Sequence, residues 1–300
     1  MPPRMLTEVD WDLLIGRIRD GKCTPFLGAG ASVGVIPLAG TIARQWADKY
    51  DYPLPDRGNL IQVAQFLAVQ AQESTFPKTQ LKRLVGDVTP DFNRPTEIHS
   101  VLARLPLPIY ITTNYDDFMF QALSLVDKRP VAELCRWNKR LPESTNSSAE
   151  IRKSAFDEGS EFALSPETPV VFHLHGSFTE PDSMVLTEDD YLDFLINVGD
   201  DRRLLPHPIE KAFVQTSLLF LGYRLADANF RVVFRSLVNY LQRNFTRAHV
   251  SVQLAPDGLS SEQRDKALAY LDSYFKELKI RVYWGTCEEF AEDLTQRMGA

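Results

Sequence analysis

The sequence has few cysteines and none of the spacings that cysteines adopt in structural sites. Its three cysteines, Cys23, Cys135 and Cys287, lie far apart in a chain of 300 residues, and no Cys-x-x-Cys pair occurs. Such separation argues against both a zinc ribbon and a disulfide framework. We therefore predict a fold with no zinc ribbon, and the cysteine usage favours a reducing, cytoplasmic setting.

Long apolar runs and an excess of basic charge are also missing. No 18 consecutive residues are apolar, and the first ten residues, MPPRMLTEVD, lack the apolar segment of a secretory signal. The 33 lysines and arginines are outnumbered by 40 aspartates and glutamates, which gives a net charge of −7. We therefore expect no membrane span and no direct binding to nucleic acid, since broad contact with phosphate backbones needs basic surfaces.

What the sequence does contain is an alternation of short apolar strands and amphipathic helices. Apolar strands are expected at residues 23–27 and 108–113 and within the stretches PVVFHLHGSF, SLLFLGY, HVSVQLA and IRVYWGT. Helical spacing of apolar residues occurs between them, as at Trp11, Leu14, Ile15 and Ile18. Continuous apolar strands alternating with helices predict an α/β, Rossmann-like fold: a mostly parallel sheet of about six strands with helices on both faces.

The domain organisation that we expect is simple. Residues 1–300 form one domain with a core of about 20–290, and residues 41–105 form a mostly helical insertion lobe. Residues 139–168 are polar and rich in Ser, Glu and Pro, which is typical of a loop or insertion.

Polar clusters follow four of the expected strands at the point where each strand ends. They come after Leu27, Ile111, Phe172 and Leu221. In open parallel sheets, ligands bind beyond the carboxyl ends of the strands. The four clusters are therefore expected to share one edge and to form one site.

The first cluster is the glycine turn Gly28-Ala29-Gly30-Ala31-Ser32. Small residues between a strand and a helix allow backbone N–H groups to approach a pyrophosphate, although a tight turn without ligand is the alternative. The third glycine of a dehydrogenase fingerprint is misplaced, because Val33 stands where a small residue is needed and Gly34 follows. No acidic residue closes a second strand about 20 residues on, so the dehydrogenase interpretation is weakened.

The second cluster, Thr112-Thr113-Asn114-Tyr115-Asp116-Asp117, offers amide, hydroxyl and carboxylate groups. These groups suit sugar hydroxyls and a carboxamide. Asp116 could instead simply cap the helix expected to begin near Asp117.

The third cluster, His173-Leu174-His175-Gly176, pairs two histidines. With no further ligand residues nearby, we predict no metal. His175, beside a glycine at the catalytic edge, suits a general base with an ordinary pKa near 6.5, whereas His173, further back, suits a hydrogen-bonded core position.

The fourth cluster is Gly222-Tyr223-Arg224-Leu225-Ala226-Asp227-Ala228-Asn229. Gly222 permits close approach of a backbone or ligand. Asp227 or Asn229 is expected to cap the helix that follows, which has Phe230, Val233 and Phe234 on one side.

These four motifs, in this order, resemble the sirtuin family in its broad sense. The resemblance implies that the turn from Gly28 to Ser32 binds the NAD pyrophosphate, with Thr113, Gly222 and Tyr223 also at the NAD site. It implies that Asn114 and His175 are catalytic, with Asn114 near the nicotinamide ribose and His175 a base on a ribose hydroxyl. Asp116 is implied to recognise the nicotinamide amide.

The sequence departs from the protein-deacylating sirtuins. Thr113 replaces a glutamine, no zinc module follows His175, and Leu38-Ala39-Gly40 replace an Asp-Phe-Arg. The segment LFLGYRLADANFR resembles instead the bacterial sirtuin-like branch associated with antiphage defence. That branch implies an NAD glycohydrolase that depletes NAD on infection, is homo-oligomeric, and acts with a separately encoded partner such as a HerA-type ATPase, a short Argonaute or a sensor protein.

Three further functions remain as alternatives at this point. One is an NAD-dependent protein deacylase, and another is a non-catalytic module in which NAD or ADP-ribose regulates assembly. A Rossmann dehydrogenase is a third, weaker alternative.

Overall fold

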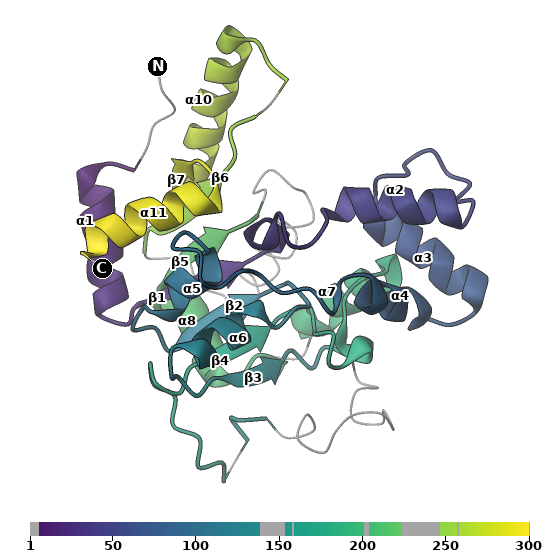
Figure 1. Cartoon of the computed structure of the whole chain (residues 1–300), viewed down its shortest axis with the longest axis horizontal. Helices are drawn as coiled ribbons and strands as arrows, with labels where there is room; N and C mark the ends of the chain where they lie inside the picture. The colour runs from purple at the N-terminus through teal and green to yellow at the C-terminus, as the bar shows by residue number, and fades with distance from the viewer. Residues whose placement is uncertain are drawn as a thin grey trace.

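The computed structural model describes residues 6–138, 154–157, 159–200, 204–223, 247–256 and 258–299. Within them the chain folds around one seven-stranded sheet of order β3-β4-β2-β1-β5-β6-β7, and all the neighbouring strands are parallel (Figure 1). The strands are β1 (Cys23–Leu27), β2 (Ile109–Thr112), β3 (Val131–Leu134), β4 (Val170–His173), β5 (Ser217–Leu221), β6 (His249–Gln253) and β7 (Ile280–Trp284). The parallel α/β fold expected from the sequence is confirmed.

Six of the strands follow the Rossmann order, with β4, β2 and β1 on one side and β5, β6 and β7 on the other. The order reverses between β1 and β5, which is the switch point where such sheets open a crevice for ligands. The seventh strand, β3, was not expected from the sequence. It has four residues on the sheet edge and is only partly buried, so its sequence, VAEL, lacks the apolar run that marks the other strands.

Helices cover both faces of the sheet. One face carries α1 (Glu8–Arg19), α5 (Ile98–Ala103), α6 (Phe118–Leu125) and α11 (Cys287–Met298), and the other carries α7 (Glu188–Asp200), α8 (His207–Gln215) and α10 (Ser261–Glu277). Successive strand residues alternate between the two cores, as Phe26 and Leu27 do. The alternation follows from the two-residue period of a strand.

Local sequence sets where several of these helices begin. Thr7 before α1, Ser260 before α10 and Thr286 before α11 each accept a hydrogen bond from the backbone N–H three residues on, and that residue's side chain bonds back. These capping boxes satisfy N–H groups that have no partner inside a helix.

The helices α2 (Ala39–Lys49), α3 (Leu60–Ala71) and α4 (Phe76–Val85) form a lobe beside the sheet (Figure 1). This helical lobe has its own apolar core, which includes Trp46, Val63 and Leu81. Met184 and Leu186, from the chain that follows β4, complete that core. The lobe is therefore seated on the segment that leads from β4 to α7.

Two regions of interest lie wholly or partly outside the described residues. The expected helix bearing Phe230, Val233 and Phe234 is one, together with Asp227 and Asn229. The other is most of the polar stretch 139–168, of which residues 154–157 and 159–168 are described and contain no helix or strand.

Candidate functional site

The last residues of five strands stand in one row across the sheet. Leu221, Leu27, Thr112, His173 and Leu134 are successive register partners in β5, β1, β2, β4 and β3. The four polar clusters begin in this row, at Thr112 and His173, or directly after it, at Gly28 and Gly222. The structure thus places the described residues of the clusters at one edge, as the sequence predicts. Asn114 lies two residues beyond Thr112, and His175 lies two residues beyond His173, the register partner of Thr112.

The glycine turn and the Gly222 turn meet at the switch point. The backbone N–H groups of Gly28 and Gly30 donate to the carbonyl oxygens of Leu221 and Gly222, each at 2.9 Å. Gly222 has a left-handed φ of +75°, and a side chain there would collide with the backbone of Ala31 and Gly28. A Cβ on Gly30 would lie 2.8 Å from the Gly222 α-carbon. These glycines allow the two turns to touch, so the turns form a close-packed floor at the switch point.

Tyr223 covers part of this floor. A Cβ on Gly28 would lie 2.7 Å from the Tyr223 ring, so only glycine fits beneath it. The Tyr223 hydroxyl donates to the Leu27 carbonyl oxygen at 2.7 Å and lies 2.6 Å from the Thr113 hydroxyl. The sequence did not indicate this contact between the second and fourth clusters.

Asn114 connects the end of β2 to the glycine turn. Its side-chain amide donates to the Gly28 carbonyl oxygen at 3.2 Å and to the Ser32 hydroxyl at 3.3 Å. Its own backbone N–H donates to the Thr112 hydroxyl at 2.9 Å. With 9% of its surface exposed, Asn114 is fixed against the turn rather than extended into solvent.

Asp116 bonds both to the start of α6 and to the glycine turn. One carboxylate oxygen accepts the backbone N–H of Phe118 at 3.2 Å at the start of α6, and the other accepts the Ser32 hydroxyl at 3.5 Å. Burial raises the pKa of the Asp116 carboxyl above its usual range. Helix capping and membership of the cluster are therefore compatible.

His175 lies in a pocket of aromatic side chains. Its ring contacts Tyr191 and Phe194 edge to face, with centroids 5.6 and 5.0 Å away. Only 6% of the residue is exposed, and its Nε2 has no hydrogen-bond partner among the residues that the structure describes. The two contacting rings come from α7, so the sequence did not indicate them: the only signal was the apolar character of α7.

The pKa of His175 differs from the expected value. Burial among apolar groups disfavours the charged imidazolium and lowers its pKa from 6.5 to about 3. The ordinary pKa near 6.5 that the sequence suggested for this residue is wrong. His175 is therefore a neutral imidazole throughout the physiological pH range.

His173 occupies the core position that we expected for it. It is the last residue of β4, it is 2% exposed, and its Nδ1 lies 3.4 Å from the Asn114 carbonyl oxygen. Burial lowers its pKa to about 4. β4 ends at His173, and His175 lies in the turn beyond it.

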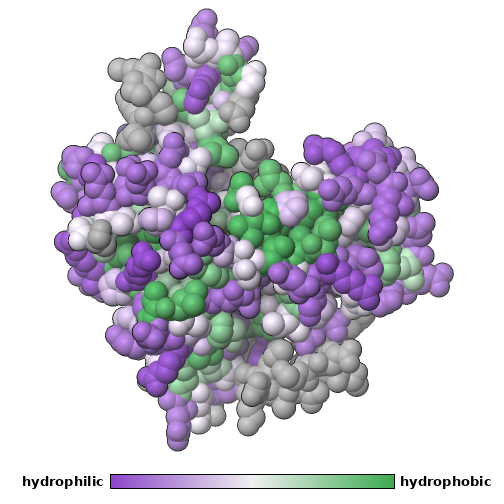
Figure 2. Space-filling view, viewed as in Figure 1, coloured by the Kyte–Doolittle hydropathy of each residue, from purple (hydrophilic) through white to green (hydrophobic). Residues whose placement is uncertain are grey.

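The site borders an apolar surface. Figure 2 shows hydrophobic side chains gathered between the sheet domain and the helical lobe, where the loop after the glycine turn runs in Figure 1. In that loop Val33 and Leu38 are 58% and 52% exposed.

The described part of the chain contains no group of three His, Cys, Asp or Glu side chains that could hold a metal ion. None of the described helices is long and apolar enough to cross a membrane.

The known proteins that this chain resembles share one name. Proteins named NAD(+) hydrolase ThsA are 24% identical over 245 residues in Bacillus cereus (strain MSX-D12) and 24% identical over 274 residues in Cytobacillus dafuensis. These alignments cover 79% and 87% of this chain but 45% and 48% of the relatives. The chain thus spans about half the length of the curated relatives it matches.

A family model gives the more decisive match. The model for the SIR2-like domain aligns with residues 108–283, which is more than half of the chain and includes Asn114, His175 and Gly222. The parallel sheet and the glycine turns at its switch point agree with this assignment. The chain belongs to the SIR2-like domain family.

Proposed function

We propose that this chain hydrolyses NAD to nicotinamide and ADP-ribose. The observation that carries the proposal is the shared edge on which the glycine turn, the Asn114 amide and the unpartnered imidazole of His175 converge. The relatives named NAD(+) hydrolase, which align with more than three quarters of the chain, support the same activity.

The reaction breaks the N-glycosidic bond between the ribose and nicotinamide. The nicotinamide ring nitrogen is cationic in NAD, so it leaves as a neutral molecule and needs little acid catalysis. What the protein must supply is a held ribose, a placed water molecule and an acceptor for its proton. In this proposal Asn114 positions the ribose and the water, Asp116 recognises the carboxamide, and the glycine turn with Thr113, Gly222 and Tyr223 lies along the rest of NAD.

The proposal gives the low pKa of His175 a role. A neutral imidazole can accept a proton from water or a ribose hydroxyl at any physiological pH, although with a pKa of about 3 it is a weak base.

The wider biological role extends the same proposal. We propose a cytoplasmic antiphage effector that depletes NAD, assembles as a homo-oligomer and responds to a separately encoded partner, such as a HerA-type ATPase, a short Argonaute or a sensor protein. The resemblance of the segment LFLGYRLADANFR to the sirtuin-like defence branch supports this extension.

The test is incubation of the purified chain with NAD alone, with and without the product of a neighbouring gene, while nicotinamide and ADP-ribose are quantified. We expect both products in equal amounts with no acylated peptide present. Product formation that requires an acylated peptide would indicate a deacylase instead. NAD binding without product in every condition would indicate a regulatory binding module.

A further inference from the structure

The segment of residues 183–187, which we call the strap, joins the helical lobe to the turn that bears His175. Its alternating side chains enter different cores: Met184 and Leu186 pack into the lobe, whereas Val185 packs into the core beneath the sheet. The strap is thus the seam between two separately packed parts of the molecule.

The strap holds the His175 turn through backbone contacts. The Val185 N–H donates to the His175 carbonyl oxygen at 2.9 Å, and the Ser183 hydroxyl accepts the Ser177 N–H at 3.0 Å. Gly176 has a φ of +83°, and a side chain there would collide with Ser183. The Tyr115 hydroxyl, beside Asn114 in sequence, donates to the Val185 carbonyl oxygen at 2.6 Å. Displacement of the strap would therefore displace His175.

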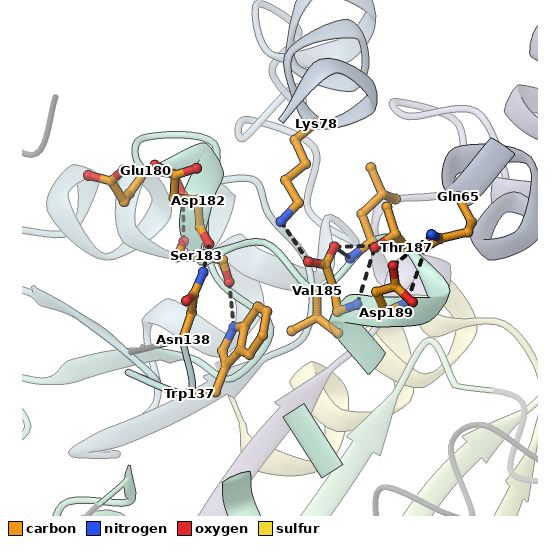
Figure 3. A network of polar contacts seen from close by, with 12 residues as sticks. Gln65, Lys78, Trp137, Asn138, Glu180, Asp182, Ser183, Val185, Thr187 and Asp189 are labelled. Carbon is orange, nitrogen blue, oxygen red and sulfur yellow. Dashed lines mark hydrogen bonds and ion pairs between the residues drawn. The ribbon is translucent and has the colours of Figure 1, made fainter. Parts of the chain in front are cut away.

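A buried ion pair fixes the strap in turn. One oxygen of the Asp190 carboxylate accepts the N–H groups of Leu186 and Thr187, at 3.0 and 2.9 Å. The other oxygen is 2.8 Å from the Lys78 ammonium, which comes from α4 of the lobe (Figure 3). Both residues are buried, at 2% and 9% exposed. Nothing in the NAD reaction proposed above uses either charge.

The same ion pair lies next to the walls of the His175 pocket. Tyr191, which follows Asp190 in α7, packs against the His175 ring. The Lys78 ammonium lies 5.9 Å from the centre of the Trp137 ring, and the Trp137 indole N–H donates to the Ser183 carbonyl oxygen at 2.7 Å. Lys78 is therefore linked to both ends of the strap through one residue each, Asp190 at one end and Trp137 at the other.

We infer that Lys78 and Asp190 are a positioning pair, which couples the seating of the helical lobe to the placement of His175 and so to the rate of NAD hydrolysis. The inference rests on the proposed function for its link to rate, but the coupling itself is a property of the fold. Removing one partner of a buried pair leaves an uncompensated charge, so the carboxylate of Asp190 would seek water and release the strap.

The test compares Lys78→Met with a matched control, Gln65→Ala. Gln65 also joins the lobe to the start of α7, because its side chain bonds the Asp189 carboxylate at 2.8 Å and the Asp189 N–H at 3.1 Å, but it does not bond the strap. We expect Lys78→Met to lower kcat per folded molecule at least 10-fold with less than a 3-fold change in KM for NAD. Gln65→Ala should stay within 2-fold of the original protein in both.

Hydrogen–deuterium exchange gives a readout that does not depend on activity. In Lys78→Met, amides of residues 175–187 should exchange at least 10-fold faster, while those of β1 and β5 stay unchanged. If Lys78→Met does not fold, Lys78→Gln replaces it, because glutamine can still donate one hydrogen bond to Asp190. Lys78→Gln should then show faster exchange in the same residues, with a smaller increase in rate.

Two results would overturn the inference: unchanged exchange in residues 175–187, or equal losses of kcat in the Lys78 and Gln65 variants. A protein that shows the exchange pattern but hydrolyses no NAD would refute the proposed function while the structural coupling stands.

Discussion

The cluster around Gly28 and the pocket around His175 lie at the same row of strand ends, yet they are built in opposite ways. Asn114, Ser32 and Asp116 satisfy one another and the glycine turn with hydrogen bonds. His175 instead sits among aromatic rings with its Nε2 unsatisfied. A buried polar atom without a partner costs about 1–3 kcal/mol. Under the proposed function, the first region binds NAD and the second keeps a costly group for chemistry.

The largest effect should come from His175, because proton transfer by a positioned side chain contributes about 10²–10⁴-fold to a rate. We expect His175→Phe to lose NAD hydrolysis by that factor, measured as nicotinamide release. Phenylalanine keeps the contacts with Tyr191 and Phe194 and removes the unsatisfied nitrogen. The variant should therefore melt no lower than the original protein, and a large drop in its melting temperature would contradict a purely chemical role.

Asn114→Ala should have the next largest effect, about 10²-fold on kcat/KM. The change removes the amide that joins the Gly28 carbonyl to the Ser32 hydroxyl and the group proposed to place the ribose. Each lost hydrogen bond contributes about 1 kcal/mol to stability, so thermal unfolding should show a modest loss as well. If stability falls but turnover per folded molecule is retained, Asn114 is a structural residue of the turn.

Lowering the pH should destabilise the folded protein through His175 more than through the residues around Gly28. The folded pKa of His175 is about 3, below the unfolded value of 6.5, so between these values the unfolded chain binds a proton that the folded chain does not. Stability is therefore lost as the pH falls below about 6.5, by about 2 kcal/mol at pH 5 from this one residue.

His173 and His249, whose pKa values burial lowers to about 4, add to the acid effect in the same direction. Denaturant unfolding at pH 7 and pH 5 measures it. The His175→Phe variant should lose less stability than the original protein over that range. Equal pH dependence in the original protein and His175→Phe would show that His175 is hydrated and not buried as described.

Ser32→Ala should have the smallest effect, about two- to five-fold on KM for NAD. The Ser32 hydroxyl lies 3.5 Å from the Asp116 carboxylate, at the limit of a hydrogen bond, and the Asn114 amide keeps its contact with Gly28 when it is gone. Steady-state kinetics of the variant measure this change. A loss as large as that of Asn114→Ala would mean that the hydroxyl contacts NAD itself.

The sequence predicts the sheet and the shared edge because both depend on local patterns. Apolar strands such as Cys23–Leu27 can be recognised from the sequence alone, and parallel pairing brings their ends together. The strand Val131–Leu134 cannot be recognised in this way, because an edge strand with one exposed face needs no apolar run. The low pKa of His175 could not be predicted from the sequence either, because the rings that bury this residue belong to α7.

The ion pair of Lys78 and Asp190 shows the same limit more sharply. The two residues are 112 positions apart, and a lysine in an amphipathic helix is ordinarily expected on its solvated face. Only the seating of the lobe on the strap buries both charges. Long-range contacts between separately packed cores are thus the part of this site that sequence patterns do not contain.

The most direct test of the account is the fate of NAD in the presence of the original protein and of His175→Phe, with the neighbouring-gene product added to both and NAD binding measured in parallel. The account predicts equal amounts of nicotinamide and ADP-ribose from the original protein without an acylated peptide. It predicts that His175→Phe binds NAD with similar affinity and leaves it intact. Turnover retained in His175→Phe, or NAD left whole by the original protein, would contradict it.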